Sequence, residues 1–148
     1  MSYFQFEADF VDSLRCIPMR VRYKLDTSGI KLKLHHWHQL TQTERQQLVD
    51  LPCDSKAEIL DYRDTLQALV VSYCGSPAPG LPVEPHPAWL DPTRIPDSVQ
   101  TKAKAAGVAL PLEQWANLSP LQRFALIKLS RSGHENRNFV PALREFCG

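Results

Sequence analysis

Apolar residues recur along this chain at intervals of three and four positions, the spacing that places them on one face of an α-helix. The clearest stretch is 55–74, where Ser55 and Glu58 form a capping box at the predicted helix start and Gly75 marks the end. Its apolar positions are Ile59, Tyr62, Leu66, Leu69, Val70 and Tyr73. Strand-like alternation is confined to residues 3–6, too few for a reliable strand, so the predicted fold class is all-α.

The chain also resembles itself at an offset of 78 residues. Residues 17–51 align without a gap with residues 95–129, and 12 of the 35 positions are identical. Average composition gives about two matches by chance. The identical pairs are Ile17/Ile95, Pro18/Pro96, Val21/Val99, Lys24/Lys102, Gly29/Gly107, Leu32/Leu110, Leu34/Leu112, Trp37/Trp115, Leu40/Leu118, Arg45/Arg123, Leu48/Leu126 and Leu51/Leu129. We interpret the two stretches as copies of one helical unit.

Each copy predicts the same order of helices. A proline suited to a first helical turn opens a helix of about ten residues, which a glycine ends (Pro18 to Gly29, Pro96 to Gly107). A short turn of helix around the tryptophan follows. Thr41, which forms a capping box with Glu44, and Ser119 are then the expected N-caps of a further helix.

A shorter closing helix is predicted over about 139–146, with Asn138 as N-cap and Pro141 at the third helical position. The predicted architecture is one helical domain over 1–148. Its first half spans about 10–75, a connector about 76–95 and the second half about 96–147.

The connector lies in a segment, GSPAPGLPVEPHPAWLDPTRIP (75–96), that holds seven of the 12 prolines of the chain. Such a segment favours extended, stiff geometry over helix or central strand. Four apolar side chains are available to pin it to the surface: Leu81, Val83, Trp89 and Leu90. The alternative interpretation is a ligand for SH3-like domains.

Composition and charge argue against several classes of protein. The chain has 148 residues, is 43% hydrophobic and carries a net charge of +1, which argues against a general nucleic-acid binder. No apolar run approaches the roughly 18 residues of a membrane span, and no Lys or Arg precedes Arg15 to form a signal or transit peptide. We therefore expect a cytoplasmic protein that does not engage a membrane. Its cysteines are expected to be reduced and mostly buried, with zinc binding as the alternative. They are Cys16, Cys53, Cys74 and Cys147.

Three histidines surround Trp37. On a helix His35 and His38 share one face while His36 points away, and two ligands are too few for a metal site. The second copy has Glu113, Gln114 and Ala116 at these positions, as expected of solvated side chains. We expect neither a metal nor another cofactor.

The first copy holds a basic segment that the second copy lacks. Its members are Arg15, Arg20, Arg22, Lys24, Lys31 and Lys33, against one acid, Asp26. Val21, Leu25, Ile30, Leu32 and Leu34 should point inward. This should leave one contiguous solvent face formed by Arg20, Arg22, Lys24, Lys31 and Lys33. This face is the candidate surface for docking an acidic partner. A separate expectation, that shared charges cover apolar surface or pair locally, concerns Lys24/Lys102 and Arg45/Arg123.

The second candidate surface is a polar loop before the last predicted helix. It consists of His134, Glu135, Asn136, Arg137 and Asn138. Such residues have a structural explanation, because they can cap helix ends and form hydrogen bonds with unpaired backbone groups. The functional alternative is a loop that recognises a partner, since functional residues favour loops. One His and one Glu, without a nucleophile, metal or phosphate-binding loop, do not make a catalytic site.

Two blocks of the sequence, FEADFVDSLRCIPMRVRYKLDTSGIKL (6–32) and LQRFALIKLSRSGHENRNFVPALREF (121–146), resemble the cyanobacterial nitrate reductase-associated protein family. The likeness extends over essentially the whole chain except its Pro-rich middle. It implies a cytoplasmic accessory protein needed for active assimilatory nitrate reductase, an enzyme with a molybdopterin cofactor and an iron–sulfur cluster that takes electrons from ferredoxin. The resemblance brings no catalytic residues.

The expected function is therefore a non-catalytic accessory or assembly factor that binds nitrate reductase, with ferredoxin or another acidic protein as a further partner. Residue patterns alone leave a second class open, a small regulatory protein that binds nucleic acid through its basic first copy. A third, a metal- or redox-binding module, uses the histidines and cysteines.

Overall fold

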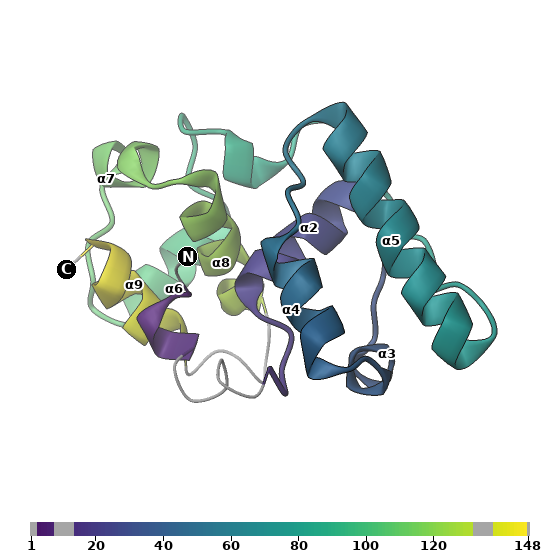
Figure 1. The fold of residues 1–148 in the computed structure, drawn as a ribbon. Helices are drawn as coiled ribbons and strands as arrows, with labels where there is room; N and C mark the ends of the chain where they lie inside the picture. Colours follow the sequence, from purple (N-terminus) through teal and green to yellow (C-terminus); the bar gives the residue numbers. More distant parts are fainter. Residues whose placement is uncertain (1–2, 8–13, 132–137, 148) are drawn as a thin grey trace. The chain divides into compact units, whose positions relative to one another are not determined.

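The computed structural model describes residues 3–7, 14–131 and 138–147. These residues form eight α-helices and two short 3-10 helices, with no strand among them, so the predicted all-α class is confirmed (Figure 1). The chain divides into two compact units, one formed by Glu7–Val83 and the other by Glu84–Gly148 with Ser2–Phe6. No helix in the described ranges is long and apolar enough to cross a membrane.

The first unit contains four α-helices. They are α2 (Met19–Ser28), α3 (Leu34–Gln39), α4 (Gln42–Asp50) and α5 (Lys56–Cys74). Helix α2 packs against α4 and α5, and α3 packs against α5, the long teal helix of Figure 1. Tyr62, Leu66 and Val70 of α5 are fully buried, at the spacing that the sequence predicted. Tyr73 was expected on the same face but is 43% exposed.

The second unit also contains four α-helices in its described residues, and the last of them is shorter than α5. Its elements are η2 (Ala88–Leu90), α6 (Asp97–Ala105), α7 (Leu112–Asn117), α8 (Pro120–Arg131) and α9 (Phe139–Cys147). Helix α8 is central, because α6, α9 and η2 all pack against it. Its apolar residues Phe124, Leu126 and Ile127 have no exposed surface.

The start of the chain contributes to both units. The ring of Phe4 lies 4.7 Å from that of Phe146 on α9. Gln5–Glu7 forms η1, and Glu7, the first residue of the first unit, accepts a hydrogen bond from the backbone N–H of Met19 (2.9 Å). A buried carboxylate at this place favours the start of α2, because the amino end of a helix carries partial positive charge.

Helix boundaries in the two units follow the offset found in the sequence. Helices α3 and α7 begin and end 78 residues apart, and α2/α6 and α4/α8 begin 78 residues apart. Trp37 and Trp115, at equivalent places, are both fully buried. That the two stretches superpose as copies stays a prediction.

The predicted caps form. Thr41 and Glu44 exchange hydrogen bonds at the start of α4, as Ser55 and Glu58 do at the start of α5. Ser119 makes the same exchange with Gln122, which a comparison with Thr41 and Glu44 could have predicted.

Gly29 ends α2 for a steric reason. Its φ of +75° lies in the left-handed region. An added Cβ would lie 2.8 Å from Val83 Cγ2 and 3.0 Å from the carbonyl oxygen of Leu81, so the segment that follows α5 can pack there only against a glycine.

The Pro-rich segment is mostly exposed, but backbone and side-chain hydrogen bonds fix its first part. Of the four apolar side chains expected to pin it, Val83 and Leu90 are exposed and Leu81 and Trp89 are half-buried. Lys31 donates its backbone N–H to the carbonyl of Pro79 (2.8 Å), and Leu81 donates to that of Gly29 (2.8 Å). The side chain of Gln67 both donates to and accepts from the backbone of Ala78. These bonds hold residues 78–81 to the first unit, whereas η2 belongs to the second.

A buried tryptophan and an arginine organise the first unit. The indole N–H of Trp37 donates to the carbonyl of Leu14 (2.6 Å), a residue with a φ of +53°. Arg45 of α4 donates to the carbonyls of Trp37 (3.1 Å) and His38 (3.2 Å) near the end of α3. The guanidinium thus supplies donors that the last turn of a short helix lacks.

The second unit makes the equivalent arrangement. Trp115 donates its indole N–H to the carbonyl of Asp91 (3.0 Å). Arg123 donates to the carbonyls of Trp115 and Ala116 (both 3.4 Å) and to that of Trp89 in η2 (2.7 Å). The expectation that these shared arginines pair locally is confirmed.

Replacing Arg123 by alanine should lower the free energy of unfolding by about 2–3 kcal/mol, because three carbonyls lose a charged donor at a site where the side chain is 6% exposed. Arg131→Ala, at an exposed position of the same helix, is the matched control and should change it by about 0.5 kcal/mol or less. Urea unfolding followed by circular dichroism measures both. Equal losses in the two variants would contradict a structural role for Arg123.

Candidate partner-docking surface

The basic segment of the first unit begins before α2 and ends at the start of α3. Arg15 is exposed, and so are Lys31 and Lys33 in the connection between α2 and α3. The predicted orientation of Lys31 and Lys33 toward solvent is confirmed. They provide positive charge on the first unit that a partner can reach.

The two arginines of α2 are less accessible than predicted. Arg20 and Arg22 are both half-buried, and the Nε of Arg22 donates to the carbonyl of Ile17 (3.1 Å). Arg20 and Arg22 stand on either side of the buried Val21 in the sequence. This does not place them opposite Val21, because side chains on a helix repeat every 3.6 residues and not every two.

Lys24 corrects the prediction of a contiguous basic face. It is only 8% exposed, and its ammonium donates to the carbonyls of Val49 (2.7 Å) and Leu51 at the end of α4. The ring of Tyr62 lies 5.6 Å from its Nζ. Burial, with Arg20 nearby, holds the pKa of Lys24 below its ordinary value. Lys24 therefore closes the carboxyl end of α4, where cations are favoured, and is unavailable to a partner.

The sequence pattern of α2 already indicates that Lys24 is buried. Val21, Lys24, Leu25 and Ser28 fall on one face of α2 and are all buried. The shared pair Lys24/Lys102 had also been expected to act structurally, and this expectation is confirmed for Lys24. Lys102 is half-buried.

The five apolar residues expected to point inward differ in their burial. Val21, Leu25 and Ile30 are buried as predicted, and Leu32 is half-buried. The prediction for Leu34 is wrong: it is the first residue of α3 and is 49% exposed.

The histidines of α3 have different roles. His36 is buried, and its Nδ1 accepts the backbone N–H of Lys33 (3.1 Å), which caps the helix. Burial, together with the neighbouring His35 and Lys33, lowers the pKa of His36. His35 and His38 are exposed, and Nε2 of His38 lies 2.9 Å from the carbonyl oxygen of Arg15. The described ranges contain no group of three His, Cys, Asp or Glu residues that could hold a metal ion.

The cysteines are all free thiols. Cys53 is buried, and burial raises its pKa to about 11, which makes its thiolate scarce at neutral pH. Cys147 is half-buried, but Cys16 and Cys74 are exposed, so the expectation of mostly buried thiols is wrong.

The second candidate surface lies almost entirely outside the described residues. Of its members, His134, Glu135, Asn136 and Arg137 fall outside them. Asn138 is half-buried and immediately precedes α9, which begins at Phe139 as predicted.

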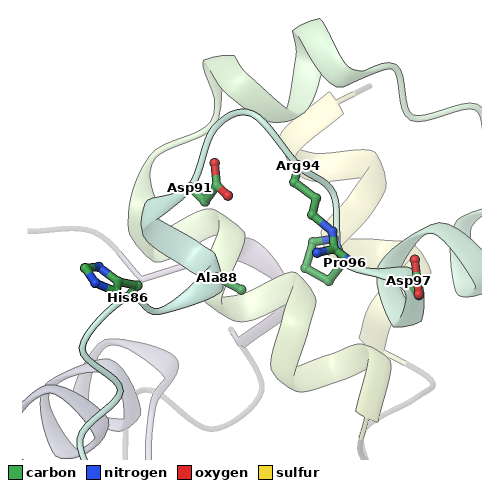
Figure 2. Close-up of a pocket in the computed structure, with 6 residues that line it drawn as sticks. All are labelled: His86, Ala88, Asp91, Arg94, Pro96 and Asp97. Atoms are coloured by element: carbon green, nitrogen blue, oxygen red, sulfur yellow. The ribbon is translucent and has the colours of Figure 1, made fainter.

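The second unit contains a cavity of about 330 Å³ that the sequence did not predict. His86, Asp91 and Arg94 of the Pro-rich segment line it, with Asp97 at the start of α6 (Figure 2). Asp91 forms hydrogen bonds with the turn that follows. Its carboxylate accepts one from the backbone N–H of Thr93 (2.9 Å) and one from the hydroxyl of Thr93 (2.5 Å). These bonds hold the pKa of Asp91 below its ordinary value. Residue patterns in the sequence do not predict this cavity.

The described residues thus define an all-α protein with two compact units and exposed basic residues on both sides of α2. The model of the conserved nitrate reductase-associated protein family matches residues 3–146. The chain belongs to this family, as the resemblance implied. No curated protein and no solved structure matches the chain.

Lys24→Met keeps the aliphatic stem but removes the donor to the end of α4. It should lower the free energy of unfolding by about 1–3 kcal/mol, since the two carbonyls lose their charged partner. The control is Lys102→Met, at the equivalent half-buried position, with an expected change of about 0.5 kcal/mol or less. Urea unfolding of both variants is the measurement, and a Lys24→Met protein as stable as wild type would refute the role assigned to this lysine.

Proposed function

We propose that the protein is a non-catalytic accessory factor, acting in the cytoplasm, that ferredoxin-dependent assimilatory nitrate reductase needs for activity. It acts by binding the reductase. Family membership over residues 3–146 is the observation that carries the proposal, because the family is described by its association with nitrate reductase. Ferredoxin, as an acidic electron donor, is a further partner under the same proposal.

The exposed basic residues of the first unit support binding to an acidic surface. Arg15, Lys31 and Lys33 are exposed on one unit of a chain whose net charge is only +1. Local charge of one sign steers an oppositely charged protein during encounter even when the whole molecule is nearly neutral. We therefore place the reductase on this part of the first unit.

The same observations weaken the nucleic-acid alternative. Phosphate binding draws its affinity from many accessible cations. Lys24 is buried, and Arg20 and Arg22 are half-buried, so half of the six basic residues are not fully exposed. A few exposed cations suit a protein partner, which also offers apolar contacts.

Deleting the gene should lower nitrate reductase activity in cells grown on nitrate, and tagged protein should co-purify with the reductase. The molybdenum content of the reductase from the deletion strain shows whether the factor acts in cofactor insertion. Unchanged activity and molybdenum content, with no co-purification, would refute the proposal.

Reversing Arg15, Lys31 and Lys33 to Glu should slow association with purified reductase by about tenfold at low salt, because steering is lost. The difference should shrink as salt screens the charges. The fold should persist, since exposed charges contribute little to stability. Stopped-flow or surface plasmon resonance measures the rates.

The control carries the same change of net charge on the second unit. Arg94, Lys104 and Arg144 are exposed there and are reversed to Glu together. If both triple variants slow association equally, net charge alone is responsible and the docking surface lies elsewhere.

A further inference from the structure

One pair of identical residues in the two halves is not explained by packing. Leu34 and Leu112 are the first residues of α3 and α7, and each is 49% exposed. The other identical aliphatic and tryptophan positions are buried or half-buried in both halves. Exposed leucines scattered over a surface need no explanation, so the surroundings of the two decide what each can do.

Exposed lysines and histidines flank Leu34 in the sequence. Lys31 and Lys33 precede it and are exposed, and His35 and His38 follow it on α3 and are exposed. The backbone of Arg15 lies next to α3, because its carbonyl oxygen is 2.9 Å from Nε2 of His38. We define the Leu34 surface as Arg15, Lys31, Lys33, Leu34, His35 and His38.

Leu112 has the same backbone position without these charges. Pro111 stands before it and Glu113 after it, and both are exposed. No Lys, Arg or His occurs from Ala109 to Asn117. The chain therefore contains two leucines of equal exposure at equivalent helix positions, one that follows two exposed lysines and one that precedes an acid.

We propose that Leu34 is the apolar anchor of the docking surface, and that its occupant is an acidic segment of nitrate reductase with an apolar side chain between its carboxylates. The inference rests on the proposed function and names the chemistry of the partner. Interfaces concentrate their affinity in a few apolar anchors, while polar groups at the rim exclude water and set specificity. Lysines around an exposed leucine select a carboxylate-rich segment over a neutral apolar one by charge complementarity.

The anchor and the charges should affect different rates. Loss of an anchor acts on dissociation, whereas loss of exposed charge acts on association. Leu34→Ala should therefore raise the dissociation rate constant of the reductase complex by about tenfold and leave the association rate and its salt dependence unchanged. Leu112→Ala, which removes an equally exposed leucine, should change neither rate.

Surface plasmon resonance with immobilised reductase tests this, with circular dichroism melting of each variant as the folding control. Leu34→Gln, which keeps a similar volume but replaces the apolar contact with a polar group, should also dissociate faster and tests the anchor should Leu34→Ala fold poorly. Leu34→Met, which keeps an apolar side chain of similar volume, should dissociate as the wild type does. Wild-type dissociation by Leu34→Ala, or equal acceleration by Leu112→Ala, overturns the anchor while the proposed function stands. If the wild type itself does not bind the reductase, both fall.

Discussion

Each unit depends on burying a tryptophan whose indole N–H keeps a hydrogen-bond acceptor. Trp37 and Trp115 have no exposed surface, and each donates to a backbone carbonyl of the segment that enters its unit. A buried donor without an acceptor would cost more than the hydrogen bond yields, so the entering segment is held in one position. The six-residue helices that carry these rings are too short to be stable alone, and Arg45 and Arg123 bond their final carbonyls.

Local signals made most helices predictable. The caps at Thr41 and Ser55 and the glycines at 29 and 75 fix helix ends through hydrogen bonds and dihedral angles within a few residues, so the sequence specifies them directly. The boundary between Val83 and Glu84 falls inside the predicted connector, but its position and the cavity beside Asp91 depend on the three-dimensional packing of the Pro-rich segment, which no local pattern contains.

Only part of the basic docking surface could be predicted, because local sequence does not show which side of a helix its neighbours cover. Exposure of Arg15, Lys31 and Lys33 follows from their place outside helices, but that of a helical residue depends on which face the neighbours cover. Lys24 lies on the same buried face of α2 as Val21 and Leu25. Its ammonium points inward because it donates to a carbonyl at the end of α4 that has no partner within the helix. The sequence shows the face but not the acceptors, so charge alone predicted an exposed lysine.

Comparison of the two halves separates residues that serve the fold from residues available for recognition. Arg45 and Arg123 are identical and bond backbone carbonyls within their units, whereas Lys31 and Lys33 have no counterpart in the second half and are exposed. A partner that binds one half and not the other must contact what differs between them. The charged residues next to α3 and α7 differ while the leading leucine does not, so under the proposed docking the lysines near α3 would supply discrimination and Leu34 would supply apolar contact area.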